Sequence, residues 1–542
     1  MSLPRMFAVP RALRDPWLAA SWAGLVIVCA LIAAFGQDAG VTWDEGFQLQ
    51  YGQRVLAWFR SGFQDRGALE YLDLYLYGGL FDAPAQWIVE HSSLGPFETR
   101  HVLTAIVALL GMYGTWLIAA AVGGTRAGFF GAATLALTPA WIGHGLFNPK
   151  DVPFATATVF VTWAAQRIAL GEGPLRAREV LIAGLTVGAA LGVRPGGYFL
   201  ISYPILAAIV RELRASTDTG QHAISRAARA LPLLGLLLGT AWLVMLSAWP
   251  WAQLDPVARP VEAMYAASHF NWPNEMLFEG RQVLSTELPA RYLLVWFGIT
   301  SPEIYFIAAA AGVAMLVFAI RARSWNSVRG VGCGFIAWSA AFPLMAALVT
   351  RPTLYDAHRH FLFLFPPLAA LGGIAIADFT RDARIWSSVR ASVLGAWSVA
   401  ALLVAVEIVE LHPYEYVYFN RLAGGLPGAS GRYETDYWGA SYREGLEWVV
   451  AHVHQQRPLR IAACDSSAAG RLHYYLQRWP GAARRFSIVE SPGDADLFLA
   501  VTRFNCHRRV AAEALHSIER QGVPLLYVLH PTRTTDAVRS AL

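Results

Sequence analysis

The sequence predicts a multi-span α-helical membrane protein, with about eleven transmembrane helices followed by a small C-terminal α/β domain. Its 542 residues are 55% hydrophobic and 15% charged, with a mean hydropathy of +0.39, whereas soluble domains carry about 25% charged residues. Apolar runs long enough to cross a bilayer recur along most of the chain. The remaining C-terminal residues are more polar and alternate strand-like with helix-like segments.

The predicted spans divide the chain into a membrane domain, 1–410, and a C-terminal domain, 411–542. The first apolar run follows a basic N-terminus and has no evident small-residue cleavage site, which favours an uncleaved span over a signal peptide. Two long loops, 37–99 and 251–290, interrupt the series. The spans fall at about 17–36, 101–122, 127–143, 152–170, 178–193, 196–211, 231–250, 303–321, 331–350, 361–379 and 391–409.

The arginines indicate the orientation of these spans. They fill the N-terminal segment and every second loop, whereas most acidic residues lie in the alternate loops. By the positive-inside rule, the N-terminus is cytoplasmic and both long loops face outward. An odd number of spans then places 411–542 in the periplasm of a protein of the inner (plasma) membrane. Because the arginines form no patch, we expect no nucleic-acid partner despite the net charge of +5.

The C-terminal domain is predicted to contain strands at 459–464, 486–490, 497–501 and 523–529, with helices at 467–479 and 508–520. Cys464 and Cys506 each follow a strand candidate in an oxidising compartment, so a disulfide between them is possible, although spacing alone does not establish proximity. The aromatic stretch 412–439 joins this domain to the last span. It suits a belt at the membrane interface better than a surface for stacking sugars.

Two adjacent carboxylates, Asp44 and Glu45, follow the first span. Ionisable groups at the edge of a bilayer are costly and usually functional, although a solvated acidic loop is the simpler alternative. The next segment, 47–59, mixes apolar and polar residues at helical spacing. This pattern predicts a helix on the membrane surface or an ordinary amphipathic loop helix.

Cationic side chains lie at the same predicted boundary. Lys150 is the only lysine among 43 basic residues, and it precedes Asp151 between the third and fourth spans. A compact ammonium at this position suits a phosphate, the alternative being the chance survival of one lysine. Arg359 lies just before the tenth span and is either a forked phosphate ligand or a snorkelling interfacial arginine. Arg194, in a tight turn, is either a further ligand or a helix cap.

Carboxylates and cations at one membrane boundary suit the transfer of a sugar from a lipid phosphate. The cations would bind the phosphate and offset the charge of the leaving group. A carboxylate would take the proton of the acceptor hydroxyl. A neutralised phosphate leaves readily, so one base suffices, and the paired carboxylates of glycosidases need not apply.

Three segments resemble the C-type (GT-C) fold of polyprenyl-phosphate-dependent glycosyltransferases: Asp44-Glu45, the run 148–154, and the run 358–363 with Pro366-Pro367. The resemblance is strongest to glycosyltransferase family 39, the group of protein O-mannosyltransferases and aminoarabinose transferases. It covers about residues 17–410. The C-terminal domain does not resemble the repeat-type luminal domain of the eukaryotic mannosyltransferases, which indicates a bacterial-type member.

The resemblance implies roles for individual residues. Asp44 would be the catalytic base, Glu45 would support donor or acceptor, and Asp151 would be the second acidic residue. Lys150 and Arg359 would bind the donor phosphate. We expect the phosphate-binding set to be Lys150, Arg359, Arg194, His358 and His360. Members of this group generally invert the anomeric centre.

Two further points follow from the resemblance. The late motif of the family often reads Arg-Tyr, whereas this chain has Arg359-His360, so the role of His360 stays open. Some relatives bind a divalent metal and others need none, so a divalent metal is possible and we assign no metal ligand. The expected partners are a polyprenyl-phosphate sugar, membrane lipid, and an acceptor hydroxyl on a protein, lipid or glycan. Loop 251–290, with His269 and Glu275, is expected to help select donor or acceptor.

Two other classes of protein compete with this interpretation. A lipid or glycan transporter or flippase would place ionisable residues near the bilayer midplane, often in repeated halves. The sequence shows no internal repeat, and its predicted spans are nearly free of acidic residues. A non-catalytic scaffold that binds a cell-envelope partner would have no use for Lys150-Asp151 beside Asp44-Glu45. A large separation between Asp44 and Asp151 would favour the scaffold.

Overall fold

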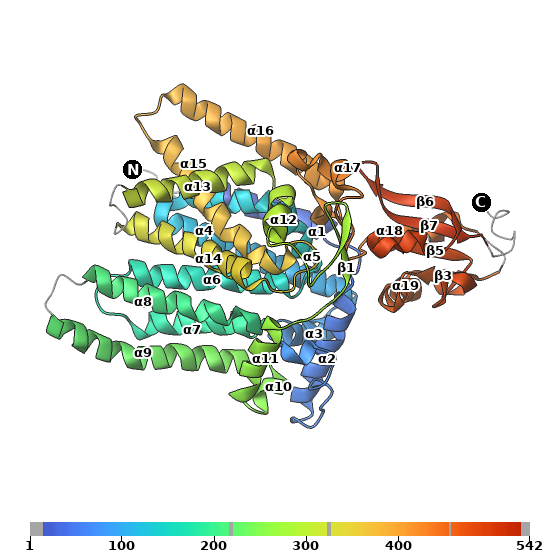
Figure 1. The fold of residues 1–542 in the computed structure, drawn as a ribbon, viewed down its shortest axis with the longest axis horizontal. Coiled ribbons are helices and arrows are strands. Elements are labelled where there is room, and N and C mark those ends of the chain that lie inside the picture. The colour runs from blue at the N-terminus through green and yellow to red at the C-terminus, as the bar shows by residue number, and fades with distance from the viewer. Residues whose placement is uncertain (1–14, 216–219, 322–326, 455–456, 533–542) are drawn as a thin grey trace, which may run out of the picture.

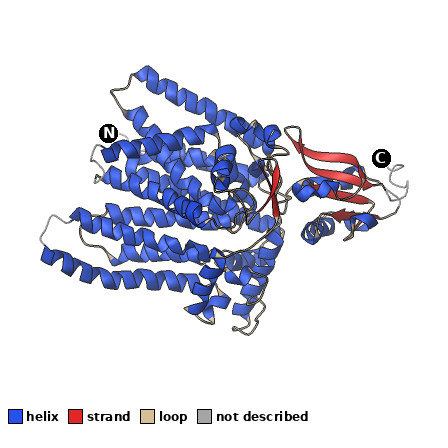
Figure 2. Cartoon of the chain, in the orientation of Figure 1, coloured by secondary structure: helices blue, strands red, loops and turns tan. Residues whose placement is uncertain are grey.

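The long helices of the protein lie side by side, and a β-sheet packs at one end of them (Figure 1). This computed structural model describes residues 15–215, 220–321, 327–454 and 457–532. Strands occur only toward that end of the molecule in the described part of the chain, and the body is helical (Figure 2). The loops that join α6 to α7 and α15 to α16 lie at the opposite end (Figure 1).

Ten longer helices form the bundle. They are α1 (Pro16–Phe35), α4 (Pro96–Ala136), α6 (Asp151–Leu170), α7 (Ala177–Leu191), α8 (Ser202–Ala215), α9 (Gly220–Leu246), α13 (Glu303–Arg321), α14 (Val328–Thr350), α15 (Phe365–Arg381) and α16 (Ser387–Leu411). Shorter elements complete it: α5 (Pro139–Phe147), η3 (Pro195–Ile201), α12 (Tyr292–Thr300) and η4 (Arg359–Leu364). Proline opens α1, α4 and α5, because its fixed φ suits a first turn that needs no N–H donor.

Six of the described helical segments are long and apolar enough to cross a membrane, or seven if the bent pair α12–α13 is one span. The chain is therefore a multi-pass membrane protein. The predicted spans 101–122 and 127–143 fall largely on α4 and α5, and α4 is broken between them at Gly124, where φ is 71°. Helices α6 and α7 cover two other predicted spans but are not among the six. The count of about eleven stays a prediction.

Glycines allow α15 to approach its neighbours closely. A Cβ added at Gly373 would clash with the backbone nitrogen of Gly131 in α4, and one at Gly372 would lie 2.6 Å from the Cβ of Ala308 in α13. Small residues are the usual means by which helices pack at short range in membranes. Helix α15 is thus held between α4 and α13, which fixes the position of η4 immediately before it.

The two long loops are largely ordered as helices and one hairpin. They contain α2 (Glu45–Arg60), η2 (Leu74–Leu76), α3 (Asp82–His91), α10 (Pro250–Gln253), α11 (Ala258–Ser268), β1 (Glu275–Phe278) and β2 (Arg281–Leu284). Helix α2 confirms the helix predicted at 47–59 and runs across the direction of α7 and α9 (Figure 1). Its position on a membrane surface stays a prediction. Strands β1 and β2 are antiparallel and joined by Glu279 and Gly280, both with positive φ, as a tight hairpin requires.

The chain after α16 forms short helices and a mixed sheet. The helical elements are η5 (Glu415–Val417), η6 (Arg421–Ala423), α17 (Gly425–Ala429), α18 (Tyr442–His452), α19 (Ser466–Arg478), α20 (Ala482–Arg485), η7 (Pro492–Asp494) and η8 (Arg503–Arg508). The strands are β3 (Leu459–Ala463), β4 (Phe486–Ile488), β5 (Leu497–Val501), β6 (Ala512–Arg520) and β7 (Val523–Pro531), in the order β4-β3-β5-β7-β6. Strand β3 is parallel to β4 and β5, and β7 is antiparallel to β5 and β6.

Most of the secondary structure predicted for this region agrees with the structure, with one error. Four strands and the helix at 467–479 lie where the sequence placed them. The predicted helix at 508–520 is wrong, because Ala512–Arg520 is strand β6. Gln521 and Gly522 both have positive φ and form the two-residue turn that favours a hairpin. Pairing with β7 therefore overrides the helix propensity of the alanine, glutamate and leucine in this segment.

The C-terminal elements are cross-linked and packed onto the bundle. Cys464, after β3, and Cys506, in η8 after β5, form a disulfide with a Cα–Cα distance of 5.9 Å. One hydrophobic cluster includes Phe147 and Trp296 of the bundle together with Leu472 and Leu499 of the C-terminal part. The sheet is thus fixed against the end of the bundle, and a domain boundary at residue 411 stays a prediction.

Candidate active site

Four of the predicted site residues meet where the bundle contacts the C-terminal segment. Asp44 precedes α2, Asp151 begins α6, Arg194 precedes η3, and Arg359 begins η4. Helix N-termini carry partial positive charge, which stabilises carboxylates such as Asp151. The structure therefore brings together segments that are more than 300 residues apart. Asp44 and Asp151 both contact the guanidinium of Arg359.

Arg359 lies at the centre of this cluster. Its Nη1 donates a hydrogen bond of 2.9 Å to Oδ2 of Asp44 and lies 3.5 Å from Oδ2 of Asp151. Its Nε lies 3.2 Å from Oδ2 of Asp356. The side chain is 5% exposed. One buried guanidinium is thus shared by three carboxylates, which we call the Arg359 cluster.

Two aromatic rings lie against this guanidinium. Its central carbon lies 4.9 Å from the ring centroids of both Tyr355 and Trp438, a distance at which cation–π attraction is significant. Tyr355 also contacts His360 and Trp272, with ring centroids 4.6 and 4.5 Å apart. Burial raises the pKa of the Tyr355 phenol, so the ring stays neutral at physiological pH. The rings fix the plane of the guanidinium and exclude water from its faces.

Asp44 is the accessible carboxylate of the cluster. Its side chain is 31% exposed, compared with 1% for Asp151 and 5% for Asp356. It stands at the N-cap position of α2 but makes no capping hydrogen bond. Its carboxylate is therefore oriented by Arg359 rather than by its own helix. Of the three carboxylates, Asp44 can meet an incoming hydroxyl without a rearrangement.

Asp151 is buried between two arginines. Its Oδ1 lies 2.6 Å from Nη1 of Arg194, and its Oδ2 accepts a 2.9 Å hydrogen bond from Nδ2 of Asn148. The amide oxygen of Asn148 accepts the Asp151 N–H at 2.8 Å. Asp151 thus fixes Arg194 and Arg359 relative to each other, as a positioning residue would.

Lys150 lies beside this cluster without an ionic partner among the described residues. Its Nζ is 3.6 Å from the ring centroid of Tyr77. Behind it, Arg100 and Asp82 form a buried ion pair. Burial raises the pKa of the Asp82 carboxyl, while Arg100 and Lys150 oppose that shift. The ammonium of Lys150 therefore remains available to an anion.

Glu45 and His358 are directed into the protein rather than toward the cluster. Glu45 is buried, and its Oε2 accepts hydrogen bonds from the N–H and hydroxyl of Thr42 at 2.7 and 2.9 Å. Its Oε1 lies 2.7 Å from Nε2 of His101. His358 packs against Phe297 and Phe365. Both residues thus position their segments, and their contacts do not support the expected contact with substrate.

The residues expected in loop 251–290 also lie elsewhere. His269 is exposed and stacks on Tyr265 at 4.1 Å, and Glu275 is the exposed first residue of β1. The loop does reach the cluster, through the contact of Trp272 with Tyr355. His360 lies at the cluster, and its Nε2 is buried without a hydrogen-bond partner.

Sequence reasoning missed the C-terminal contribution to the site. Arg503 of η8 forms a buried ion pair with Asp356 and lies 3.8 Å from Oε1 of Glu434. Burial raises the pKa of Glu434 to about 7, with Arg503 opposing the shift. The acidic and aromatic run that contains Trp438 is visible in the sequence, but its composition favours a belt at the membrane interface. No local signal marks Arg503, because its partner lies 147 residues away.

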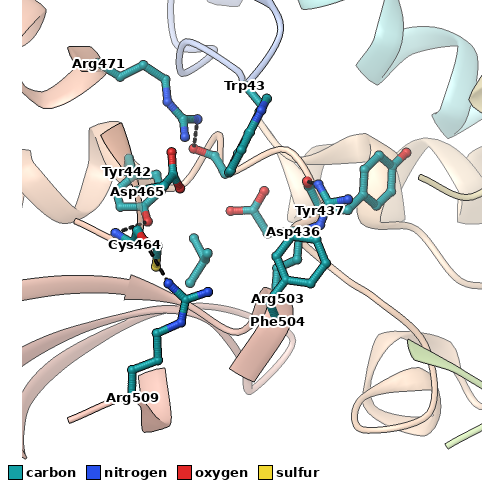
Figure 3. Close-up of a pocket in the computed structure, with 12 residues that line it drawn as sticks. Trp43, Asp436, Tyr437, Tyr442, Cys464, Asp465, Arg471, Arg503, Phe504 and Arg509 are labelled. Atoms are coloured by element: carbon teal, nitrogen blue, oxygen red, sulfur yellow. Dashed lines mark hydrogen bonds between the residues drawn. The ribbon is translucent and has the colours of Figure 1, made fainter. Parts of the chain in front are cut away.

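Three cavities adjoin the site. One of about 400 Å³ lies between Trp43 and the ends of β3 and β5 (Figure 3). One of about 820 Å³ lies between α2 and α19, and one of about 690 Å³ lies between α12 and the end of α14. Within the described ranges, no group of three or more His, Cys, Asp or Glu side chains is arranged to hold a metal ion.

A comparison with protein families finds no match, and a comparison with curated protein sequences finds none. Solved structures with a similar arrangement include ArnT from Cupriavidus metallidurans in the apo state, at 16% identity over 94% of this chain and 98% of that chain, with a TM-score of 0.47. The same protein bound to undecaprenyl phosphate gives 17% identity, 95% and 98% coverage, and a TM-score of 0.49.

The archaeal oligosaccharyltransferase AglB from Archaeoglobus fulgidus, in complex with an inhibitory peptide and a dolichol-phosphate, is also similar. It is 12% identical over 90% of this chain and 65% of that chain, with a TM-score of 0.47. ArnT is an aminoarabinose transferase, so the group that the sequence resembles is represented among the structural neighbours. At these identities and TM-scores the likeness carries no argument about chemistry, which rests on the residues of this chain.

Proposed function

We propose that this chain is an integral membrane glycosyltransferase that moves a sugar from a polyprenyl-phosphate donor to an acceptor hydroxyl on the outer face of the inner membrane. The observation that carries the proposal is the Arg359 cluster, in which one accessible carboxylate, Asp44, is held on a buried guanidinium. Arg194 and Lys150 add positive charge next to it. The cluster lies at one end of a bundle of membrane-length helices. The phosphate of a lipid-linked donor would lie at the same level, at the surface of the membrane.

Asp44 is proposed as the general base. It would accept the proton of the acceptor hydroxyl while that oxygen forms a bond to the anomeric carbon. The bond from the anomeric carbon to the phosphate oxygen breaks, and polyprenyl phosphate departs with the electron pair. Attack opposite the leaving group inverts the anomeric centre. A positioned base of this kind contributes about 10²- to 10⁴-fold to the rate.

The cations are proposed to bind the donor phosphate. Arg359 and Arg194 share the carboxylate of Asp151, so both guanidiniums are in place before the donor arrives. Preorganised donors stabilise the charge that develops on the leaving group without a cost of reorganisation. Lys150, whose ammonium rests on the Tyr77 ring, supplies a point charge from another side. His360 faces the same cluster and is a further candidate ligand.

The cavities fit two substrates that arrive from different directions. The 690 Å³ cavity has a mixed lining, with the polar side chains of Ser285, Thr286, Glu287 and Arg351 beside apolar ones of α12 and α14. It lies next to Tyr355 and is proposed to admit the donor. The 820 Å³ groove between α2 and α19 is lined by Phe47, Leu49 and Phe97 together with Gln50, Gln53 and Ser467, and it is proposed to admit the acceptor. Donor and acceptor would then meet at Asp44.

The proposal is tested with the full chain in nanodiscs, a panel of polyprenyl-phosphate sugars and a cell-envelope extract as the source of acceptor hydroxyls. We expect release of free polyprenyl phosphate by the wild type and a loss of about 10²- to 10⁴-fold in Asp44→Asn. Asp65→Asn, an exposed carboxylate in the same loop, is the matched control and should be unaffected. Full activity of Asp44→Asn would remove Asp44 from this role. Binding without turnover of every donor would favour a transporter or flippase.

A further inference from the structure

One buried arginine outside the Arg359 cluster has no ionic partner. The buried arginines in the described part of the chain are Arg100, Arg211, Arg359, Arg471 and Arg503. Four of them form ion pairs with aspartate or glutamate. Arg471 of α19, which is 4% exposed, forms no ion pair with any residue that the structure describes. A buried charge without a partner is strongly unfavourable, so this exception calls for an explanation.

Backbone carbonyls orient Arg471 but do not neutralise it. Its Nη1 donates to the carbonyl oxygens of Val41, Trp438 and Gly439 at 3.2, 3.0 and 3.1 Å. Its guanidinium carbon lies 4.9 Å from the ring centroid of Tyr442. Its Nη2 is buried and has no hydrogen-bond partner. The guanidinium is therefore fixed in direction and keeps one donor nitrogen and its full charge available.

This guanidinium lines the 400 Å³ cavity, which two further arginines also line (Figure 3). Arg509 enters it from the opposite side, where its Nη1 donates to the carbonyl oxygen of Cys464 at 2.8 Å, and Arg503 also lines it while paired with Asp356. The two carboxylates that line the cavity accept hydrogen bonds from backbone N–H groups or hydroxyls. Asp436 accepts hydrogen bonds from the N–H groups of residues 440 and 441 and from two hydroxyls, and Asp465 caps α19. The lining therefore offers unpaired positive charge to an anion.

The place of the cavity in the sheet supports the same conclusion. It lies at the carboxyl ends of the parallel strands β3 and β5. The chain leaves β3 toward β4 and leaves β5 toward the other half of the sheet. Open α/β sheets bind their ligands at such a switch point. Arg471 also lines the 820 Å³ groove between α2 and α19, so it stands where the groove and the cavity adjoin.

We propose that this cavity binds an anionic group, a phosphate or a carboxylate, of the acceptor, and that Arg471 pairs with it. The inference rests on the proposed glycosyl transfer, since the acceptor is the second substrate of that reaction. Trp43 lines the cavity and precedes Asp44, so an acceptor anchored at Arg471 lies next to the proposed base. A neutral acceptor would leave the guanidinium unpaired.

The test is calorimetric titration of the full chain in neutral-lipid nanodiscs with glucose 6-phosphate, glucuronate and glucose as probes. We expect the wild type to bind at least one of the two anions and not glucose. Arg471→Gln should weaken that binding about tenfold or more, and Arg471→Lys should weaken it less. Arg478→Gln, an exposed arginine on the same helix, is the matched control and should bind as the wild type does.

A second variant guards against a folding defect in Arg471→Gln. Arg509→Gln leaves the carbonyl contacts of Arg471 in place and should weaken anion binding about threefold. Nanodiscs that contain phosphatidic acid distinguish the source of the anion. Competition by that lipid against glucose 6-phosphate indicates a lipid headgroup, and its absence indicates a soluble glycan phosphate.

Binding of the anions is separable from the transfer reaction itself. Anion binding that is absent from the wild type, or equal in wild type, Arg471→Gln and Arg509→Gln, would overturn this inference and leave the transferase proposal standing. Binding that disappears in Arg359→Gln but survives in Arg471→Gln would overturn it as well, because the probes would then occupy the donor-phosphate site. Intact binding at Arg471 with no polyprenyl-phosphate release from any donor counts against the transferase alone.

Discussion

Arg211 and Arg359 are both buried arginines that contact opposite ends of helix α6, and they differ in what surrounds them. Arg211 lies near the C-terminus of α6, where one carboxylate and several carbonyls take its hydrogen bonds. Its partners are Glu179 at 2.9 Å and the carbonyl oxygens of Ile168, Glu172, Gly173 and Pro174 at 2.9 to 3.3 Å. Cations at helix C-termini commonly cap carbonyls in this way.

Arg359, near the N-terminus of the same helix, is surrounded by carboxylates instead. Asp44, Asp151 and Asp356 share its charge, and the first of them is accessible. Arg211 has all three of its nitrogens engaged and its charge paired with Glu179, so it has no capacity left for a ligand. An arginine held by a surplus of carboxylates can exchange one of them for a phosphate. Burial alone therefore does not distinguish a structural arginine from one in a site, whereas its free donors and the balance of charge around it do.

The largest effect on stability is expected at the C-terminal end of α6, where Arg211 lies. Arg211→Gln removes the partner of Glu179 and leaves several carbonyls unsatisfied, so it should lower the free energy of unfolding by about 3 kcal/mol. Thermal unfolding in detergent measures this loss. Turnover per folded molecule should be unchanged. A large loss of turnover with unchanged stability would show that the comparison with Arg359 is mistaken.

The converse variant should impair turnover more than stability. Arg359→Gln removes the proposed phosphate ligand and the group that orients Asp44, and donor turnover should fall about 100- to 1000-fold. The measurement is release of polyprenyl phosphate at saturating donor. Arg384→Gln, an exposed arginine in the loop after α15, serves as the control. Turnover within twofold of the wild type would exclude Arg359 from the reaction.

The buried carboxyl group of Glu434 should make the stability of the protein depend on pH. Burial raises the pKa of Glu434 to about 7 from a model-peptide value of 4.5. The folded protein thus binds this proton more tightly than the unfolded chain. The resulting stability is present below about pH 4 and is lost as the pH rises through about 7.

Glu434→Gln removes that titration. The free energy of unfolding of the variant, relative to the wild type, should therefore increase between pH 5 and pH 8, by about 1–3 kcal/mol. Denaturation at several pH values measures the difference. Glu447→Gln, an exposed carboxylate on α18, should show no such trend. A difference that falls as the pH rises would have the wrong sign for a buried acid.

The smallest effect is expected at the rim of the Arg359 cluster. Trp272→Ala removes the ring contact with Tyr355, and aromatic pairs of this kind contribute about 0.5–1.5 kcal/mol. The KM for donor or acceptor should rise about two- to tenfold, with stability near that of the wild type. His269→Ala, three residues earlier and turned away from the cluster, is the control. A larger effect of His269→Ala would restore the role first expected for that histidine.

Hydrophobic periodicity explains why much of the architecture could be predicted from the sequence. The helices lie along apolar runs, and four of the five C-terminal strands fall on short apolar segments of the sequence. Strand β6 was not, because its residues favour a helix in isolation and its pairing with β7 is a tertiary contact. The sequence also placed Asp44, Asp151 and Arg359 at one boundary, since charges at the ends of apolar runs share a depth in the membrane.

Side-chain direction and distant contacts were not predictable in the same way. Asp44 and Glu45 are adjacent, but successive residues at a helix start point in directions about 100° apart, and only Asp44 faces Arg359. His358 is turned into a core of phenylalanine rings for a similar reason. Asp356, Trp438 and Arg503 join the site through partners far along the chain, and no spacing rule reveals such contacts.

The placement of Trp438 and Arg503 has a consequence for the order in which the site is assembled. The ribosome synthesises the membrane helices first, and these carry Asp44, Asp151 and Arg359. Trp438, which covers the guanidinium, and Arg503, which pairs with Asp356, belong to the last fifth or so of the chain. A nascent chain therefore holds its carboxylates and cations in an unfinished arrangement. The proposed site is therefore complete only when the final segment has been synthesised and has packed against the bundle.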